Sequence, residues 1–276
     1  MAAAALAAPR ISIAGETKGR FRPAICAYSF RNQLKQGSMT YADLIRMASD
    51  LGAEGVDLTA YWLADTSNET LYPLKKLAYR SGISIYNIGI GADMAQPPAL
   101  QEAEVEKVRH WLAAAEKLGA SHMRVFGGKV PKGATDDQAV AWAVETLKRC
   151  ADEAGKKGIT LGVEDDGGIT TNADRTVEIV KKAASPWVGI NLDVGNFPND
   201  AYQQIEMCAA QATNVHFKSD VHIDHKSQAA DWPRILKILG AAGYRGYLAL
   251  EYELEDDPLH AVPKLVTRMR EVIRGA

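Results

Sequence analysis

The apolar positions divide the chain into short continuous runs that alternate with longer amphipathic segments. Leu44, Met47, Ala48 and Leu51 recur at helical spacing behind Thr40, a favourable N-cap residue. The same spacing predicts helices across residues 136–154 behind Thr135, and behind Asp231. Helical patterns also end at glycines, which are common helix terminators: Gly52, Gly82, Gly119, Gly158 and Gly243.

The runs between the helical segments predict eight strands. Continuous apolar runs, rather than alternating ones, are typical of parallel strands that are covered on both faces. Eight such strands alternating with helices predict a single (β/α)8 TIM barrel. A doubly wound open sheet is the alternative, but the Gly-rich first turn usual in that fold is absent. The predicted strands cover residues 23–28, 55–58, 83–88, 121–126, 159–164, 188–193, 213–217 and 246–251.

The chain of 276 residues, 47% of them hydrophobic, can bury one large core. No Pro/Gly/Ser-rich stretch marks a linker, so we expect one barrel domain at residues 23–276 behind an N-terminal arm at residues 1–22. The Ala-rich start resembles the end of an export signal but lacks a basic n-region. We therefore expect a cytoplasmic protein, with a remnant of an export signal as the alternative reading of the arm.

Composition excludes several classes of function. A net charge of −2 leaves no basic stripe for nucleic acid, and no apolar run is long enough to span a membrane. The 3 cysteines form no CxxC pair, which argues against a zinc knuckle or a disulfide framework. Gly89–Met94 matches only part of a dinucleotide-binding motif, so we read it as a flexible loop after the third strand.

In each of the predicted strands five to eight, the apolar residues are followed by a residue that can bind a metal: Glu164, Asp193, His216 and Glu251. The carboxyl ends of parallel barrel strands meet at one rim, where active sites lie, so these four side chains should converge. Three carboxylates and an imidazole suit a divalent cation. The neighbouring Asp165 and Asp166 are instead read as solvated loop residues or helix caps.

The remaining histidines carry weaker signals. His222 and His225 have HxxH spacing on a predicted polar loop that would lie over the site, and zinc binding there is the alternative. His110, His122 and His260 are read as surface or packing residues. Arg124 and Asn87, near the ends of strands four and three, are candidate substrate contacts, and Arg124 could equally form a structural salt bridge.

Four segments of the chain resemble a known family: Leu161–Glu164, Asn191–Asn196, Val215–Lys218 and Gly243–Glu251. Across about residues 23–272 the chain resembles the xylose-isomerase-like TIM barrels, also called the sugar phosphate isomerase/epimerase family. The resemblance implies that Glu164, Asp193, His216 and Glu251 bind one divalent cation, usually manganese, magnesium or cobalt, with zinc as a further candidate. It also implies that the two glutamates move protons on opposite faces of the substrate.

The resemblance further places Lys218 and His222 near substrate oxygens. Many members have a histidine where this chain has Asn196, which can hydrogen-bond a sugar hydroxyl but cannot carry a positive charge. The implied activity is isomerisation or epimerisation of a ketose or related keto-sugar through an enediolate. The alternative, which Asn196 favours, is a metal-dependent lyase or dehydratase acting on a keto-inositol or a 3-keto-glycoside.

Two other functions agree less well with the chain. Phosphodiester hydrolysis of the endonuclease IV kind uses a three-metal cluster with more histidines than this acidic chain of 6 His offers. A non-catalytic sugar-binding barrel would not need the intact ligand positions. We therefore expect a small-molecule sugar as partner, no nucleic acid and no membrane. The family also suggests a homodimer or homotetramer.

Overall fold

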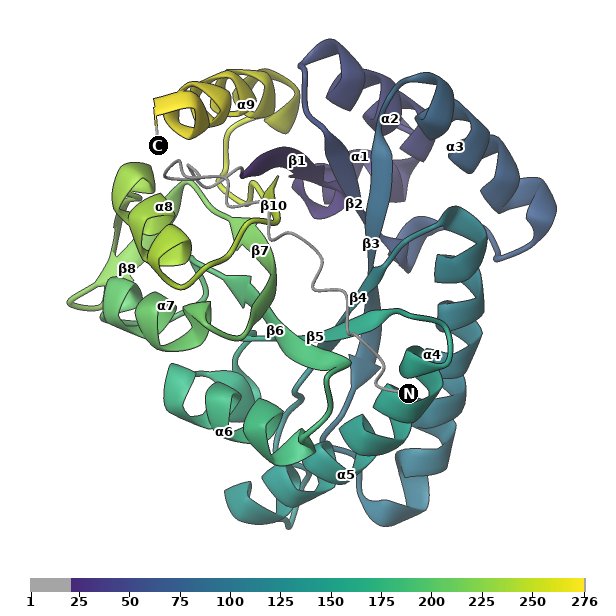
Figure 1. Cartoon of the computed structure of the whole chain (residues 1–276), viewed down its shortest axis with the longest axis vertical. Coiled ribbons are helices and arrows are strands. Elements are labelled where there is room, and N and C mark those ends of the chain that lie inside the picture. The colour runs from purple at the N-terminus through teal and green to yellow at the C-terminus, as the bar shows by residue number, and fades with distance from the viewer. Residues whose placement is uncertain (1–20, 276) are drawn as a thin grey trace, which may run out of the picture.

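Eight parallel strands close into a barrel in the computed structural model, which describes residues 21–275 (Figure 1). Around the barrel the strands follow the order β1-β10-β7-β6-β5-β4-β3-β2, so consecutive barrel strands are neighbours. Helices surround the barrel, and the predicted (β/α)8 fold is confirmed. The barrel strands are β1 (Arg22–Cys26), β2 (Gly55–Thr59), β3 (Ser84–Asp93), β4 (His122–Phe126), β5 (Thr160–Glu164), β6 (Val188–Asp193), β7 (Ala212–Phe217) and β10 (Tyr247–Leu250).

All eight predicted strands are present, within a few residues at their ends except for β3. Most of the proposed N-terminal arm, residues 1–20, lies outside the described residues. The helices are α1 (Arg31–Gln36), α2 (Tyr41–Asp50), α3 (Asn68–Arg80), α4 (Pro98–Leu118), α5 (Asp136–Gly155), α6 (Ala173–Ala183), α7 (Ala201–Ala209), α8 (Trp232–Ala241) and α9 (Pro258–Gly275).

Side-chain caps start the helices where the sequence predicted them. Thr40 and Asp43 form a capping box at the start of α2, and Thr135 and Gln138 form another at α5. Asp231 accepts a hydrogen bond from a first-turn N–H of α8. These contacts satisfy N–H groups that have no partner within the helix, and they fix the point at which each loop ends.

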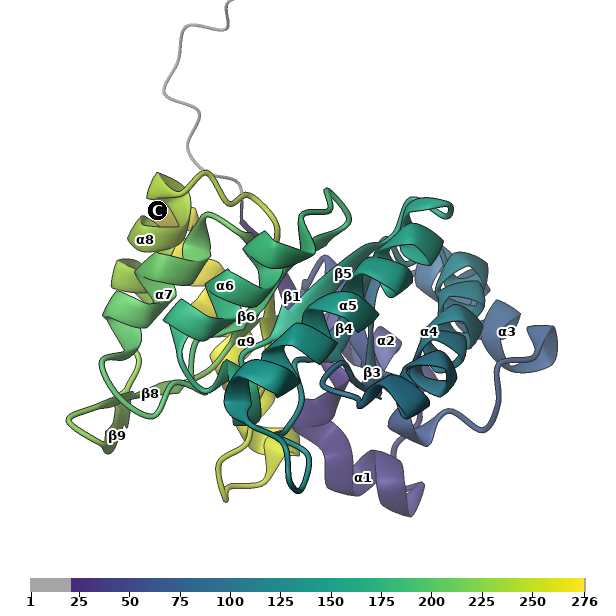
Figure 2. The same cartoon turned by 90° about the horizontal axis from the view of Figure 1, so that it is seen from below.

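Two segments differ from the prediction. The segment after Ile88 is not a loop, because β3 continues to Asp93 after an irregularity in its pairing with β4. The chain between β7 and α8 is not a plain loop either, since β8 (Asp220–Ile223) and β9 (Lys226–Ala229) form an antiparallel hairpin. This hairpin extends from the same side of the barrel as α1 (Figure 2).

The main hydrophobic core lies between the barrel and its helices, while the barrel interior is partly polar. Asp57, Asn87, His122, Asn191 and Asn214 are all buried on barrel strands. Buried polar groups need hydrogen-bond partners, so this interior forms a connected network beneath the carboxyl ends of the strands. Among the described residues, no helix is long and apolar enough to cross a membrane.

Candidate metal centre and active site

The four residues at the ends of β5, β6, β7 and β10 lie together at one rim of the barrel. Glu164 and Asp193 are the last residues of their strands, His216 precedes the last residue of β7, and Glu251 directly follows β10. None of the four is more than 5% exposed. One ligand atom from each lies within 4.8 Å of the others, so the predicted convergence is present in the structure.

His216 lies at the centre of this group. Its Nδ1 is 2.6 Å from Glu164 Oε1, 3.1 Å from Glu251 Oε2 and 3.8 Å from Asp193 Oδ2. Its Nε2 points the other way, 2.9 Å from Asp57 Oδ2. One ring nitrogen therefore faces the carboxylate cluster, and the other faces the barrel interior.

The donor set fits a divalent cation. Three carboxylates and one imidazole nitrogen are ligands that manganese, magnesium, cobalt and zinc accept. Among the described residues, Asp193 Oδ2 is buried and accepts no hydrogen bond, although Lys218 Nζ lies 3.2 Å away as an ion-pair partner. Burial raises the pKa of Asp193 well above its usual value, and the nearby carboxylates add to the shift although Lys218 opposes it. A cation at this point would relieve the crowding of negative charge.

Arg124 is a partner of Glu164. Its Nε lies 3.2 Å from Glu164 Oε2, and its Nη1 donates to the Ile90 carbonyl at 2.9 Å and to the Tyr61 hydroxyl at 3.0 Å. Its guanidinium also stacks over Phe126, 4.1 Å from the ring centroid. Arg124 thus forms the buried salt bridge that was one of its two sequence interpretations, and it also borders the cavity described below.

Lys218 connects the cluster to the loop after β10. Its Nζ lies 3.2 Å from Glu251 Oε2 and also forms an ion pair with Glu253. Burial acts to lower the pKa of Lys218, but Asp193, Glu251 and Glu253 outweigh burial and raise that pKa well above its usual value. Lys218 therefore stays positively charged and is fully engaged with carboxylates.

A cavity of about 110 Å³ opens onto the cluster. One water needs at least about 10–15 Å³, so this space can hold several waters or a small ligand. Asn196, one of the predicted substrate contacts, borders the cavity, and aromatic rings form part of the wall. The lining residues are Tyr28, Tyr61, Arg124, Phe126, Glu164, Asp166, Asp193, Asn196, Lys218, Glu251 and Glu253.

Two predicted substrate contacts do not border this cavity. Asn87 is fully buried in the barrel interior, where its Oδ1 lies 2.7 Å from His122 Nδ1. His222 lies in the β8–β9 hairpin, with its Nδ1 3.3 Å from the carbonyl oxygen of Gly195. This hydrogen bond connects the hairpin to the loop after β6.

The prediction for Asp165 was wrong. It is not a solvated loop residue or a helix cap, because it is 1% exposed and its Oδ1 accepts the backbone N–H of Asp193 at 2.7 Å. The side chain thus ties the end of β5 to the end of β6, directly beside one candidate ligand. Asp166, in contrast, is exposed to the cavity as expected.

Sequence reasoning missed the residues that support the cluster from below. Asp57 contacts His216 from β2, and Asn191 Nδ2 donates to Glu164 Oε1 at 3.0 Å from β6, while Asn214 on β7 links Asp57 to Asn191. A polar residue inside an otherwise apolar strand run was the available signal, and Asp57 and Asn191 show it.

The chain belongs to the xylose isomerase-like TIM barrel family, whose sequence profile matches residues 45–272. A comparison with curated proteins gave no match. Among solved structures, D-psicose 3-epimerase from Clostridium cellulolyticum H10, determined with D-tagatose, is similar with a TM-score of 0.74 at 16% identity, over 92% of this chain and 97% of that chain.

Two further structures have the same fold. A xylose isomerase domain protein from Planctomyces limnophilus matches with a TM-score of 0.70 at 17% identity, over 95% of this chain and 100% of that chain. The probable 3-DHS dehydratase AsbF from Bacillus anthracis matches with a TM-score of 0.69 at 16% identity, over 92% of this chain and 99% of that chain. The fold therefore occurs in both an epimerase and a probable dehydratase.

Proposed function

We propose that this chain is a divalent-metal-dependent isomerase or epimerase that acts on an uncharged ketose or related keto-sugar. The observation that carries the proposal is the placement of Glu164 and Glu251. They flank one cavity, and both lie within 3.1 Å of the same nitrogen of His216. Two carboxylates beside one small cavity can remove and return a proton on a single substrate carbon.

Glu164, Asp193, His216 and Glu251 would hold the cation, with manganese, magnesium and cobalt as the candidates and zinc as a further one. When bound, the cation would supply Lewis-acid stabilisation of the negative charge that develops on the substrate carbonyl oxygen.

The proton transfers belong to the two glutamates. One takes the proton from the carbon next to the carbonyl; the C–H electron pair forms a carbon–carbon double bond and the C=O π pair moves to the carbonyl oxygen, which gives an enediolate. The other glutamate returns a proton to the opposite face, which inverts that carbon. Arg124 orients Glu164 through their ion pair, while Lys218 does the same for Glu251.

The side-chain charges around the cavity favour a neutral substrate. Among the described residues, five carboxylates border it against two cationic side chains. Both of these side chains already pair with carboxylates, Arg124 with Glu164 and Lys218 with Asp193, Glu251 and Glu253. A phosphate would therefore find no side-chain cation in this wall that is free of a carboxylate partner. Asn196 and the aromatic rings of Tyr28 and Phe126 suit the hydroxyl groups and C–H faces of a sugar.

Elimination is the second candidate. It begins with the same proton removal, but the β carbon–oxygen bond then breaks, a carbon–carbon double bond forms and the oxygen leaves after protonation. Asn196 in the cavity wall favours this reaction, because an uncharged amide stands where many family members have a histidine. The substrate would then be a keto-inositol or a 3-keto-glycoside.

Turnover in D₂O distinguishes the two reactions. Free ketoses, keto-inositols and 3-keto-glycosides are incubated with Mn²⁺-loaded protein, and both product mass and ultraviolet absorbance are followed. We expect an isomer that carries deuterium at one carbon of the enediolate, the abstracted carbon for epimerisation or the former carbonyl carbon for isomerisation, and no such product from the Glu164→Gln variant. An unsaturated, absorbing product would instead support elimination. Full activity after exhaustive removal of the metal would contradict both reactions.

A further inference from the structure

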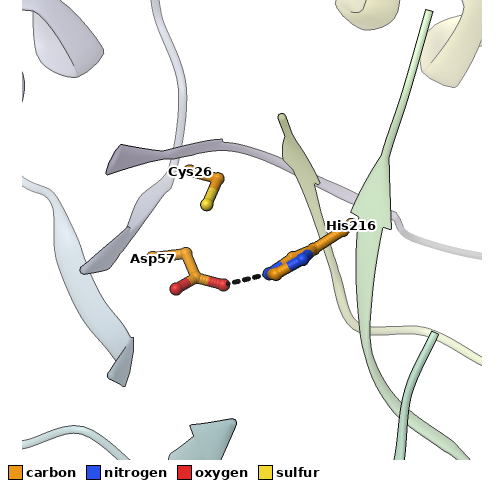
Figure 3. A group of neighbouring side chains, drawn as sticks. All are labelled: Cys26, Asp57 and His216. Carbon is orange, nitrogen blue, oxygen red and sulfur yellow. Dashed lines mark hydrogen bonds and ion pairs between the residues drawn. The ribbon is translucent and has the colours of Figure 1, made fainter. Parts of the chain in front are cut away.

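His216 joins two sets of polar side chains through its two ring nitrogens. Nδ1 faces the candidate metal ligands, whereas Nε2 lies 2.9 Å from Asp57 Oδ2 (Figure 3). Asp57 comes from β2, which is not a neighbour of β7 in the barrel, so this contact crosses the barrel interior. Both residues are 1% exposed, so the contact is shielded from bulk solvent.

Cys26, Asp57 and His216 could in principle form a second metal site, because their ligand atoms also lie within 4.8 Å of one another. A neutral imidazole, however, has only one nitrogen with a free lone pair. A metal on Nε2 would therefore require a proton on Nδ1, and His216 could no longer be a ligand of a metal at the carboxylate cluster. The cluster at Nδ1 offers three carboxylates. The Cys26 thiol donates to Glu251 Oε1 at 3.5 Å, which makes it a partner of that cluster.

Asp57 also determines the direction of a chain of hydrogen bonds. An ionised carboxylate only accepts, so Asp57 Oδ2 requires an N–H from His216 and receives another from Asn214 Nδ2 at 3.1 Å. Asn214 Nδ2 also donates to Asn191 Oδ1 at 2.7 Å. Because Asn191 Oδ1 accepts this bond, the Nδ2 group of Asn191 points to Glu164 Oε1 and donates to it. Each amide orientation follows from the one before it.

We propose that Asp57 is a positioning residue that holds His216 in the Nε2–H tautomer and, through Asn214 and Asn191, directs an N–H donor at Glu164. This inference rests on the metal centre of the proposed function. Metal-binding histidines commonly donate their second N–H to a carboxylate, which fixes the ring and makes the ligand nitrogen a better donor. Here the carboxylate of Asp57, on the opposite wall of the barrel, orients two candidate metal ligands, His216 and Glu164.

Mn²⁺ affinity tests the proposal without any need for turnover. Titration of metal-free protein, followed by the electron paramagnetic resonance signal of free Mn²⁺, should show one bound ion per chain. Asp57→Ala should weaken binding by about 10- to 100-fold, the range found when such supporting partners are removed. Asp57→Asn should lie in between, because its amide oxygen still accepts but carries no charge. Circular dichroism confirms that each variant is folded.

Cys26→Ser is the matched comparison within the same group of side chains. It removes the thiol of the alternative lower site, keeps a hydroxyl that can donate to Glu251 and leaves the Asp57–His216 contact intact, so Mn²⁺ affinity and stoichiometry should stay near wild type. Nitrogen-15 NMR of the Zn²⁺-loaded wild type should show the proton on Nε2 of His216 and the metal on Nδ1. The downfield shift of that proton, which a carboxylate acceptor causes, should be lost in Asp57→Ala.

Three results would overturn the positioning role. The first is equal Mn²⁺ affinity in wild type, Asp57→Ala and Asp57→Asn. The second is a metal on Nε2 of His216 in the loaded wild type, and the third is a second bound ion that disappears in Cys26→Ser. Failure of the wild type to bind any divalent cation is a different outcome. It would overturn the metal-dependent function itself, and the role of Asp57 with it.

Discussion

Arg124 Nε, from the middle of β4, lies 3.2 Å from Glu164 Oε2 at the end of the neighbouring strand β5. The other oxygen of Glu164 lies 2.6 Å from His216 Nδ1. Glu164 therefore connects a permanently charged guanidinium to the candidate metal ligands. Both members of the Arg124–Glu164 pair are buried, and the removal of one would leave a buried charge without its partner.

Arg124→Met should therefore lower the free energy of unfolding by about 3–5 kcal/mol, the range for breaking a buried ion pair. Denaturant unfolding measures this loss. The double variant with Glu164→Gln should be destabilised by less than the sum of the single variants, since neither charge then remains unpaired. Arg149→Met, which breaks a surface pair with Glu102, is the control and should cost about 0–1 kcal/mol. Equal losses in Arg124→Met and Arg149→Met would contradict the assigned importance of the buried pair.

Glu164→Gln and Glu251→Gln should each lower kcat by at least about 100-fold, because each loses a proton-transfer group and a metal ligand together. Glu255→Gln is the control, since this exposed glutamate follows β10, as Glu251 does, but does not border the cavity. Steady-state rates on the substrate identified by screening give the comparison. Near wild-type kcat in either variant would remove that glutamate from the proposed acid–base pair.

The barrel and the convergence of four candidate ligands followed from sequence because both depend on local patterns. Apolar runs mark the strands, and the closure of parallel strands brings their carboxyl ends to one rim. The residue after an apolar run is therefore placed by the fold itself. Glu164, Asp193, His216 and Glu251 all have this position.

Contacts across the barrel could not be read in the same way. Asp57 meets His216 only because the barrel closes with a particular register, and no local pattern encodes that register. Asp165 differs from Asp166 only in the direction that the backbone takes after β5. The β8–β9 hairpin was missed because its turn residues, Asp224 and His225, have positive φ angles of 50° and 57° without the Asn-Gly signature usual for such turns.

His122 should make stability depend on pH. Burial lowers its pKa from 6.5 to about 4, so between these values the unfolded chain binds the proton and the folded chain does not. The free energy of unfolding should then fall as pH decreases from 6.5 to 4, by roughly 3 kcal/mol from this residue. His122→Gln should show a shallower decline in denaturant unfolding across this window. Parallel pH profiles for the variant and the wild type would contradict the neutral, buried imidazole.

The charge balance of the cavity should exclude phosphorylated sugars. A phosphate near Glu253 or Asp166 would meet like charges, and such contacts cost on the order of 1–4 kcal/mol at a protein surface. We therefore expect kcat/KM for a phosphorylated ketose to be at least about tenfold below that of the free sugar, a difference of about 1.4 kcal/mol. Glu253→Gln should narrow the gap because it removes one carboxylate and frees Lys218 from one ion pair. Glu255→Gln, at an exposed position outside the cavity, should leave the gap unchanged. A wild-type preference for the phosphorylated sugar would contradict the proposal of an uncharged substrate.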